Sequence, residues 1–516
     1  MYIGDYLARR ELYSPDRTAI IDTGKTPEWR LTYRQMNERA NRLANWLRDF
    51  AGVGKGDRVA ILAHDGVEHL DVFFACGKLG AIHTALNWRL HPQELAGIVA
   101  QTTPKALVFS EDVCASVAEL QKMLHGRAYS IAHYLHTEGE GVGGSVGFES
   151  ALESSSVAPV TTDDLEDEDI AALIFTGGTT GLPKAAQVSH RMVAWNTLNT
   201  VIHDVTHDDI YLNVFPMFHT GGLFVYTLPQ VIFGGTTILM RQFDPSWVLE
   251  LVERERVTIF GAVPTMYQMI AQAPNWAAAD LSSLRFCTSG GAPLPVPLVE
   301  QYTREKSIRF KQGFGMTEFG PGIFALAPED AIRKAGSIGR PNFYVDARIV
   351  DDDNNRLGPD EEGELVLKGP SYCSGYFGDP AAGAAVVDER GYFHTGDIAR
   401  FDSEGYFYII DRKKDMFISG GENIYPAEIE KALYKHPAVL MCAVIGLPDP
   451  KWGDVGRACV VLKPGAAATE GELLAFMADR LAKYKVPKSV VILDALPISS
   501  AGKILKRELR ERYLSA

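Results

Sequence analysis

The sequence predicts an α/β protein with mostly parallel sheets in a large N-terminal domain, followed by a small α+β C-terminal domain. Helical and extended patterns alternate through the first half of the chain, which is typical of βαβ units. Apolar residues make up 46% of 516 residues, enough for a large core. A charged segment, 411–415, precedes a shorter mixed pattern, so we expect domains over residues 1–411 and 412–516.

The first elements follow from capping signals and apolar spacing. A capping box begins at Thr32, and apolar residues at helical spacing follow it, which predicts a helix. The apolar run 58–62 predicts a buried strand, residues 67–79 a second helix, and residues 81–86 a second strand. This alternation favours a parallel sheet.

The middle of the chain interrupts the alternation of helix and strand patterns. Residues 139–169 are rich in glycine, serine and acidic residues and predict a surface loop or linker. Residues 171–175 then predict a strand. The segment 220–240 carries no charge, but Pro229 and Gly234 interrupt it, so we expect a buried strand–turn–strand rather than a membrane span.

The last hundred residues predict the small domain. Pro426 begins an expected helix, residues 439–445 an apolar strand, Thr469 caps a second helix, and residues 489–493 form a final strand. The segment 411–415 is too polar for a core and is the predicted hinge.

Composition excludes several classes of protein. With 51 Lys and Arg against 65 Asp and Glu, the net charge is −14, which argues against a general nucleic-acid binder. Six scattered cysteines without a C-x-x-C pair indicate free thiols in a reducing, cytoplasmic compartment. We expect no signal peptide or transmembrane segment, and at most weak peripheral membrane contact. The sequence carries no signal for an oligomeric state.

A glycine- and threonine-rich loop is the strongest local signal. Its glycines let backbone N–H groups approach an anion, its threonines add hydroxyl donors, and its lysine adds a positive charge. Two residues separate the last glycine from the lysine, so this is not a Walker loop. We interpret it as a phosphate-binding loop that consists of Thr176, Gly177, Gly178, Thr179, Thr180, Gly181 and Lys184, with Leu and Pro between the last two.

The loop resembles the signature of the acyl-adenylate-forming superfamily, which includes acyl-CoA synthetases, adenylation domains of peptide synthetases and firefly-type luciferases. The resemblance covers essentially the whole chain, and it implies a multi-lobed large domain and a mobile C-terminal domain. It also implies a two-step reaction, in which a carboxylate attacks the α-phosphate of Mg·ATP and a thiol then displaces AMP. Six further segments match in order: 216–222, 289–293, 313–318, 392–397, 411–426 and 501–504.

The resemblance implies a nucleotide site. The loop 176–184 would grip the β- and γ-phosphates, Glu318 would bind Mg²⁺, and Thr317 would reach the α-phosphate. Asp397 would hold the ribose hydroxyls, with Arg412 near the ribose or the phosphates. The adenine would be enclosed by four residues, Gly291, Ala292, Pro293 and Phe314.

The resemblance also implies groups for the chemistry and for CoA. Lys503 would bridge the acyl carboxylate and the α-phosphate, and Lys414 occupies the usual hinge position. His219 would be the gate between the carboxylate site and the thiol channel. After adenylation, a glycine-containing segment would line the pantetheine tunnel; it begins with Ser419, Gly420 and Gly421.

Three positions depart from the family pattern. Gly177 stands where many relatives have serine, which removes one hydroxyl that would face the phosphates. Phe314 replaces a common tyrosine, so the stacking face remains without the phenolic hydrogen bond, and Ala185 replaces a common glycine. None of these changes removes a catalytic group.

The expected substrate is a fatty acid, with an aromatic or cyclic carboxylate as the alternative. A stand-alone adenylation enzyme that loads a carrier protein also remains open. A non-catalytic nucleotide-binding scaffold is disfavoured because the charged site residues are all present, and His64 with His69 is not expected to bind a metal. We expect the size of the acyl pocket to depend on His219, Phe224, Val263, Gly290, Gly315 and Ile323.

Overall fold

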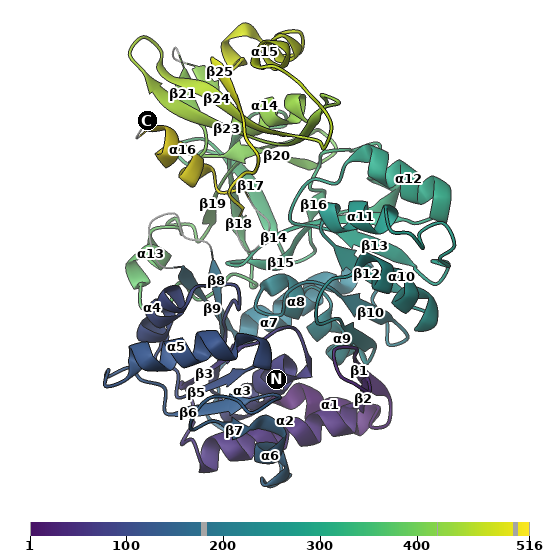
Figure 1. Ribbon diagram of the computed structural model, residues 1–516, viewed down its shortest axis with the longest axis vertical. Coiled ribbons are helices and arrows are strands. Elements are labelled where there is room, and N and C mark those ends of the chain that lie inside the picture. The colour runs from purple at the N-terminus through teal and green to yellow at the C-terminus, as the bar shows by residue number, and fades with distance from the viewer. Residues whose placement is uncertain (1, 177–182, 420–421, 499–503, 515–516) are drawn as a thin grey trace. The chain divides into compact units, whose positions relative to one another are not determined.

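The contacts within the chain form two compact units, shown in the computed structural model of Figure 1. Unit 1 comprises residues 1–346 and 368–391, and unit 2 comprises residues 347–367 and 392–516. The fold class is confirmed as α/β with mostly parallel sheets and a separate C-terminal part. The predicted boundary between residues 411 and 412 stays a prediction. The structure describes residues 2–176, 183–419, 422–498 and 504–514.

Unit 1 contains two large sheets. One is formed by β3 (Arg58–Leu62), β4 (Ile82–Ala85), β5 (Ala106–Phe109), β6 (His133–His136), β7 (Val146–Gly147), β8 (Ile170–Thr176) and β9 (Lys184–Ser189). The other is formed by β1 (Thr18–Asp22), β2 (Trp29–Thr32), β10 (Ile210–Asn213), β11 (Thr236–Leu239), β12 (Ile259–Ala262), β13 (Phe286–Ser289), β14 (Phe310–Met316), β15 (Gly320–Leu326) and β16 (Arg340–Pro341).

The strand orders of both sheets are non-sequential. They are β7-β6-β5-β3-β4-β8-β9 and β16-β15-β14-β13-β12-β10-β11-β1-β2. Among the residues that the structure describes in these two sheets, antiparallel pairs lie at or near the edges, at β8–β9, β1–β2, β14–β15 and β15–β16. Parallel neighbours need crossover connections, which helices supply.

The helices of unit 1 are α1 (Ile3–Tyr13), α2 (Tyr33–Asp49), α3 (Val67–Leu79), α4 (Pro92–Thr102), α5 (Cys114–Leu124), α6 (Phe148–Glu153), α7 (His190–Asn199), α8 (Thr220–Phe224), α9 (Thr227–Phe233), α10 (Pro245–Arg254), α11 (Pro264–Ala271), α12 (Val296–Lys306) and α13 (Pro380–Ala384). The predicted first helix is α2, and its capping box is formed because the Thr32 hydroxyl accepts a hydrogen bond from the Gln35 N–H while the Gln35 side chain accepts one from the Thr32 N–H. The prediction of α3 over residues 67–79 is also confirmed.

Two predictions for the middle of unit 1 were wrong. The expected loop 139–169 contains β7 and α6. The expected strand–turn–strand over 220–240 forms helices α8 and α9 before strand β11, and Gly234, with φ 88°, ends α9. A short apolar run fits a buried strand or a buried helix equally well, so periodicity alone does not separate the two.

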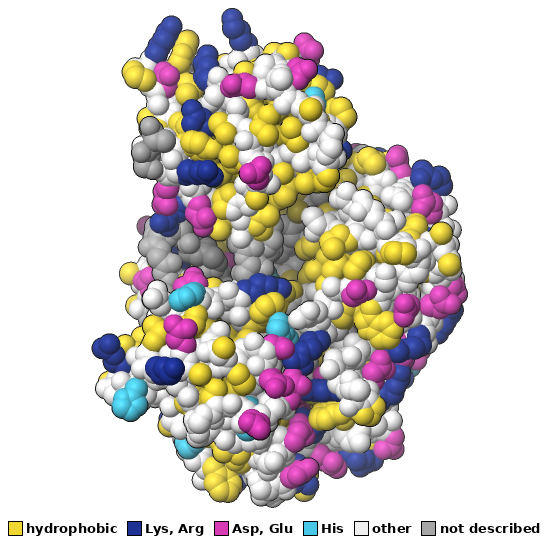
Figure 2. Space-filling model, in the orientation of Figure 1, with side chains coloured by type: hydrophobic (Ala, Val, Ile, Leu, Met, Phe, Trp, Pro, Cys, Tyr) yellow, Lys and Arg dark blue, Asp and Glu magenta, His cyan; other side chains and the backbone are white. Residues whose placement is uncertain are grey.

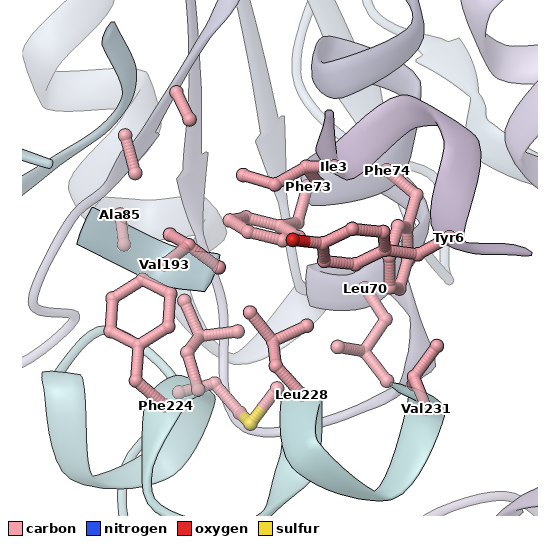
Figure 3. Packing of buried hydrophobic residues seen from close by; sticks show 14 of the residues in the cluster. Ile3, Tyr6, Leu70, Phe73, Phe74, Ala85, Val193, Phe224, Leu228 and Val231 are labelled. Carbon is pink, nitrogen blue, oxygen red and sulfur yellow. The ribbon is translucent and has the colours of Figure 1, made fainter. Parts of the chain in front are cut away.

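Figure 3 shows why this segment is apolar. Side chains of α8 and α9 point toward residues of α1, α3 and α7 in a shared core. Phe224 lies beside Ala85 and Val193 there, and Val231 lies near Leu70. A helix that is buried on several sides needs an apolar surface all round.

The described residues of unit 2 form two sheets and three α-helices. The first sheet has the order β17 (Asp346–Val350), β18 (Gly363–Lys368), β19 (Phe393–Phe401) and β20 (Phe407–Arg412). The second contains β21 (Phe417–Ser419), β22 (Glu422–Ile424), β23 (Val439–Asp449), β24 (Gly453–Leu462) and β25 (Ser489–Ile492). The helices are α14 (Pro426–Leu433), α15 (Glu470–Ala478) and α16 (Lys506–Leu514).

The structure confirms the predicted helices and strands of unit 2, but the prediction that residues 411–415 are too polar to be buried was wrong for Asp411. Asp411 is buried, although the segment 411–415 seemed too polar for a core. Its carboxylate accepts hydrogen bonds from the N–H of Ala427, 2.8 Å away in the first turn of α14, and from the N–H of Arg412. Backbone donors at a helix start compensate the buried charge.

Charged side chains of both signs are mixed on the face of the molecule that Figure 2 shows, where Lys and Arg lie interspersed with Asp and Glu. Within the described ranges, no helix has the length and apolarity that crossing a bilayer requires. His64 contacts Asp112, its Nδ1 lying 2.7 Å from the carboxylate, and its ring packs on Trp88.

Candidate active site

The predicted residues of unit 1 gather beyond the carboxyl ends of parallel strands. His219 follows β10, Gly291 follows β13, and Thr317 and Glu318 follow β14. These three strands run parallel within one sheet, so the segments that follow them meet at one edge. Open α/β sheets bind ligands at this edge.

Tyr376 joins two of the predicted phosphate-site residues. Its hydroxyl donates a hydrogen bond to Glu318 Oε1 at 2.9 Å, and the Lys184 ammonium lies 4.8 Å from the centre of its ring. Burial and the negative charge of Glu318 raise the pKa of Tyr376, which keeps it a donor. Glu318 and Lys184 therefore both contact the side chain of Tyr376.

Sequence reasoning missed Tyr376. Its backbone pairs with Ala186 of β9, two residues after Lys184, and the N–H of Cys373 donates to the carbonyl of Glu318 at 2.7 Å. These backbone contacts hold the segment against β9 and against the turn between β14 and β15. The sequence signal was a tyrosine set among the turn-forming glycines Gly375 and Gly378, which by itself indicates only a turn.

The phosphate loop is closed by the β8–β9 pair. Thr176 and Lys184 face each other across the two strands, and the Thr176 hydroxyl donates to the Lys184 carbonyl at 3.4 Å. Lys184 is thus the first residue of β9, at the mouth of the loop. The other predicted members of the loop, Gly177, Gly178, Thr179, Thr180 and Gly181, lie outside the described residues.

The predicted adenine side consists of two segments, one after β13 and one on β14. Gly291 has φ 81°, and Gly291, Ala292 and Pro293 are all exposed after β13. Phe314 is half-buried on β14, with its ring 5.9 Å from that of Phe324. At the next position, a Cβ on Gly315 would lie 2.4 Å from the carbonyl oxygen of Pro321, so only glycine fits there.

His219 is the N-cap residue of α8. Its Nδ1 accepts a hydrogen bond from the N–H of Gly221 at 3.4 Å. The loop before it is held by Asp65, which sequence reasoning did not single out: Asp65 Oδ1 accepts a hydrogen bond from the Met217 N–H at 2.8 Å. Asp65 follows the carboxyl end of β3, which was the available signal.

The expected acyl-pocket residues do not all line open space. Phe224 is 2% exposed and packs in the hydrophobic core of Figure 3, and its role in setting the size of the pocket stays a prediction. Ile323 is fully buried as well. Gly290, His219 and Val263 are half-buried and remain candidates.

Unit 2 holds the predicted ribose pair. Asp397 on β19 and Arg412 on β20 are direct cross-strand partners, with Arg412 Nε 3.1 Å from Asp397 Oδ1. Asp397 is buried, and its N–H donates to the Thr395 hydroxyl at 3.0 Å. Arg412 is about half exposed, so this carboxylate–guanidinium pair has one accessible side.

The remaining predicted residues also fall in unit 2. Burial and the neighbouring Arg412 charge lower the pKa of Lys414. Ser419 ends β21 and pairs with Glu422 and with Gly453. Lys503, Gly420 and Gly421 lie outside the described residues.

Comparison with protein families shows the family to which the chain belongs. Residues 7–377 match the family model of AMP-binding enzymes, and residues 428–503 match that of the AMP-binding enzyme C-terminal domain. The chain belongs to the AMP-binding enzyme family. As a member of the acyl-adenylate-forming superfamily, it is an acid–thiol ligase of the acyl-CoA synthetase type.

Relatives and solved structures match this AMP-binding enzyme along its whole length. A feruloyl-CoA synthase from Amycolatopsis sp is 43% identical over 512 residues, 99% of each chain. A long-chain-fatty-acid–CoA ligase from Mycobacterium tuberculosis is 37% identical, covering 99% of this chain and 98% of the relative. The ATP-bound crystal structure of MatB from Rhodopseudomonas palustris superposes with a TM-score of 0.89 at 31% identity, covering 100% and 99% of the two chains.

Glu318 of this AMP-binding enzyme fits a magnesium ligand. Its carboxylate is half-exposed, and Tyr376 is the partner that it hydrogen-bonds within the described part of the chain, through Oε1. An oxygen of a carboxylate without a cationic partner suits Mg²⁺, which commonly takes one or two carboxylates together with substrate phosphates.

Proposed function

We propose that this protein is an ATP-dependent ligase that joins an aromatic carboxylic acid to CoA. The observation that carries the ligase chemistry is the contact of Tyr376 with both Glu318, which follows β14, and Lys184, which begins β9. The aromatic acid, in place of the fatty acid expected from the sequence, is supported by the full-length identity of 43% to a feruloyl-CoA synthase.

In the first half-reaction, an oxygen of the carboxylate attacks the α-phosphorus of ATP, and the bond to the β-phosphate oxygen breaks to release pyrophosphate. Negative charge accumulates on the phosphates, so groups that neutralise it lower the barrier. Lys184 and the backbone of the 176–184 loop would hold the β- and γ-phosphates. Glu318 would hold Mg²⁺, which supplies further charge neutralisation, and Tyr376 fixes the orientation of that carboxylate.

The pair on unit 2 would bind the nucleoside. Asp397 would accept hydrogen bonds from the ribose hydroxyls, while the Arg412 guanidinium holds its carboxylate in place. Lys503 would supply an ammonium between the acyl carboxylate and the α-phosphate. These contacts hold the two reactants in line.

In the second half-reaction, the sulfur of CoA attacks the acyl carbon, the bond from that carbon to the AMP oxygen breaks, and the thiol proton is released. His219 would stand between the acyl site and the thiol channel. The segment Ser419, Gly420 and Gly421 would leave room for the pantetheine arm. A hinge near Lys414 would present this segment after adenylation.

A substrate panel tests the proposal. The protein is incubated with ATP, Mg²⁺ and CoA and with cinnamic acids, aryl-acetic acids or straight-chain fatty acids, and acyl-CoA products are identified by mass spectrometry. We expect kcat/KM for the best aromatic acid to exceed that for dodecanoate at least tenfold. A preference for dodecanoate, or thioester formation with a phosphopantetheinyl carrier protein but not with CoA, would reject it.

Lys503→Ala separates the two half-reactions. We expect pyrophosphate release to fall at least a hundredfold, because losing one group that stabilises the transition state costs roughly 3 kcal/mol. Thioester formation from supplied acyl-adenylate should stay within a few-fold of the parent protein. Lys463→Ala, at an exposed lysine of the same unit, is the control. Normal pyrophosphate release by Lys503→Ala would contradict the assignment.

A further inference from the structure

Three asparagine side chains surround Gly322 in unit 1. Gly322 lies on β15, four residues after Glu318, and is partly exposed. A Cβ at this glycine would lie 3.3 Å from Asn196 Oδ1, 3.5 Å from the Cβ of Asn199 and 3.6 Å from Asn342 Nδ2. The missing side chain therefore leaves a small space with amide groups around it.

Asn196 places this space beside the candidate active site. Its Nδ2 donates to the carbonyl of Phe224 at 2.8 Å, and its Oδ1 accepts from the N–H of Gly322 at 3.2 Å. Phe224 ends α8, the helix that His219 caps. Asn196 thus ties the helix of His219 to the strand that follows Glu318, and both of its amide groups are satisfied.

The other two asparagines are not satisfied. Asn342 is 2% exposed, and within the described residues neither its Oδ1 nor its Nδ2 makes a hydrogen bond. Asn199 is fully buried; its Oδ1 accepts from the Tyr344 N–H at 3.2 Å, which leaves its Nδ2 without a partner there. Buried amide groups are almost always paired, so these three atoms point to a missing partner.

We propose that Asn342 and Asn199 form the polar end of the acyl site and hydrogen-bond a hydroxyl group on the ring of an aromatic substrate. This inference rests on the proposed function. A phenolic hydroxyl is both a donor and an acceptor, so it can donate to Asn342 Oδ1 and accept from Asn199 Nδ2 or Asn342 Nδ2.

Other substrate ends fit less well. A methoxy group or a carboxylate only accepts hydrogen bonds, and the end of a fatty acid does neither. A second carboxylate would also face Asn342 Oδ1, and none of the three side chains around Gly322 is cationic. A site built to hydrogen-bond a hydroxyl discriminates strongly against the analogue without it, because its own buried groups are then left unpaired.

The experiment compares acids that differ only in the hydroxyl group. Pyrophosphate release is measured with cinnamate and with its 2-, 3- and 4-hydroxy derivatives, using the full-length protein. We expect the best hydroxycinnamate to exceed cinnamate at least a hundredfold in kcat/KM. Asn342→Leu should reduce this ratio to below about tenfold.

Two further variants keep the test decisive. Gly322→Ala fills the space with one methyl group and should reduce the same ratio. This variant provides the test if Asn342→Leu does not fold. Asn275→Leu is the matched control, since Asn275 also has a buried amide oxygen without a partner within the described residues, but its Nδ2 donates to Ser246, away from β15. The ratio should be unchanged in this control.

The outcomes separate the two proposals. If the parent protein forms CoA thioesters with neither cinnamate nor its hydroxy derivatives, the aromatic substrate and the inference are both rejected. If the parent instead accepts these acids, two results reject only the inference: a hydroxycinnamate-to-cinnamate ratio of kcat/KM near one, or a ratio that Asn342→Leu and Gly322→Ala leave unchanged. An ordered water is then the partner of the amides.

Discussion

At the scale of single residues, Tyr376 determines how the candidate phosphate site is held together. One side chain contacts the carboxylate of Glu318 through its hydroxyl and the ammonium of Lys184 through its ring. The hydroxyl bond fixes the carboxylate, and the ring provides a cation–π contact for the lysine. The two contacts can therefore be separated by removing one oxygen atom.

Tyr376→Phe tests the role of that oxygen. The variant loses the hydrogen bond to Glu318 but keeps the ring. We therefore expect kcat/KM for adenylation to fall about tenfold and the Mg²⁺ concentration that gives the half-maximal rate to rise. The free energy of unfolding should change by less than about 1.5 kcal/mol. ATP–pyrophosphate exchange across a Mg²⁺ titration measures this.

Tyr434→Phe is the matched control, because its hydroxyl contacts the backbone of Cys442 in unit 2, with both separations 3.4 Å. An unchanged Mg²⁺ dependence in Tyr376→Phe would show that the hydroxyl does not orient Glu318.

At the scale of elements, a buried ion pair joins the last helix to the rest of unit 2. The Lys506 ammonium, at the start of α16, lies 2.9 Å from Glu430 Oε1 of α14, and both side chains are less than one-fifth exposed. Glu430 also accepts from the Val444 N–H of β23 at 2.7 Å. Burial raises the pKa of Glu430, and Lys506 opposes this rise. The ion pair thus fixes α16 relative to α14 and β23.

Breaking this pair from one side should destabilise unit 2 more than removing both partners. Glu430→Gln leaves the Lys506 charge buried, and we expect a loss of about 3–5 kcal/mol in the free energy of unfolding. Glu430→Leu combined with Lys506→Met should recover most of it. Urea unfolding followed by circular dichroism measures both.

The exposed pair of Arg507 and Glu511 on the same helix serves as the control. Both side chains are more than half exposed, so Arg507→Ala should change stability by about 0.5 kcal/mol or less. Equal losses in Glu430→Gln and in the double variant would contradict the argument.

At the scale of the whole molecule, the stability of unit 1 should depend on pH through a buried lysine. Lys78 of α3 is 4% exposed, and its ammonium donates to Asn37 Oδ1 of α2 at 2.8 Å. Burial lowers the pKa of Lys78 to about 8. Between pH 8 and 10 the unfolded chain binds this proton and the folded chain does not, so this group makes stability rise with pH in that window.

Lys78→Met removes this contribution. The difference in free energy of unfolding between the parent protein and the variant should change by up to about 1.4 kcal/mol per pH unit from pH 8 to 10, and it should be flat below pH 7. Denaturant titrations at each pH measure it, with the exposed Lys122→Met as control. A difference that does not change across this window would mean that Lys78 stays charged when buried.

The sequence by itself determined the local elements and the motifs. The capping box at Thr32, the βαβ alternation and the loop from Thr176 to Lys184 depend on neighbouring residues, so their spacing along the chain is sufficient evidence. The family followed from the same motifs, since their order is a property of the chain alone.

The tertiary structure alone decided what depends on residues far apart. Within the apolar run 220–240, helices α8 and α9 precede β11, and side chains of both helices pack against α1, α3 and α7. Tyr376 meets Glu318 across 58 positions, and Asn342 reaches Gly322 only through the pairing of distant segments. Asp411 could be buried because the start of α14 offers it a backbone donor. Burial and hydrogen-bond partners arise from packing between elements, which local spacing does not encode.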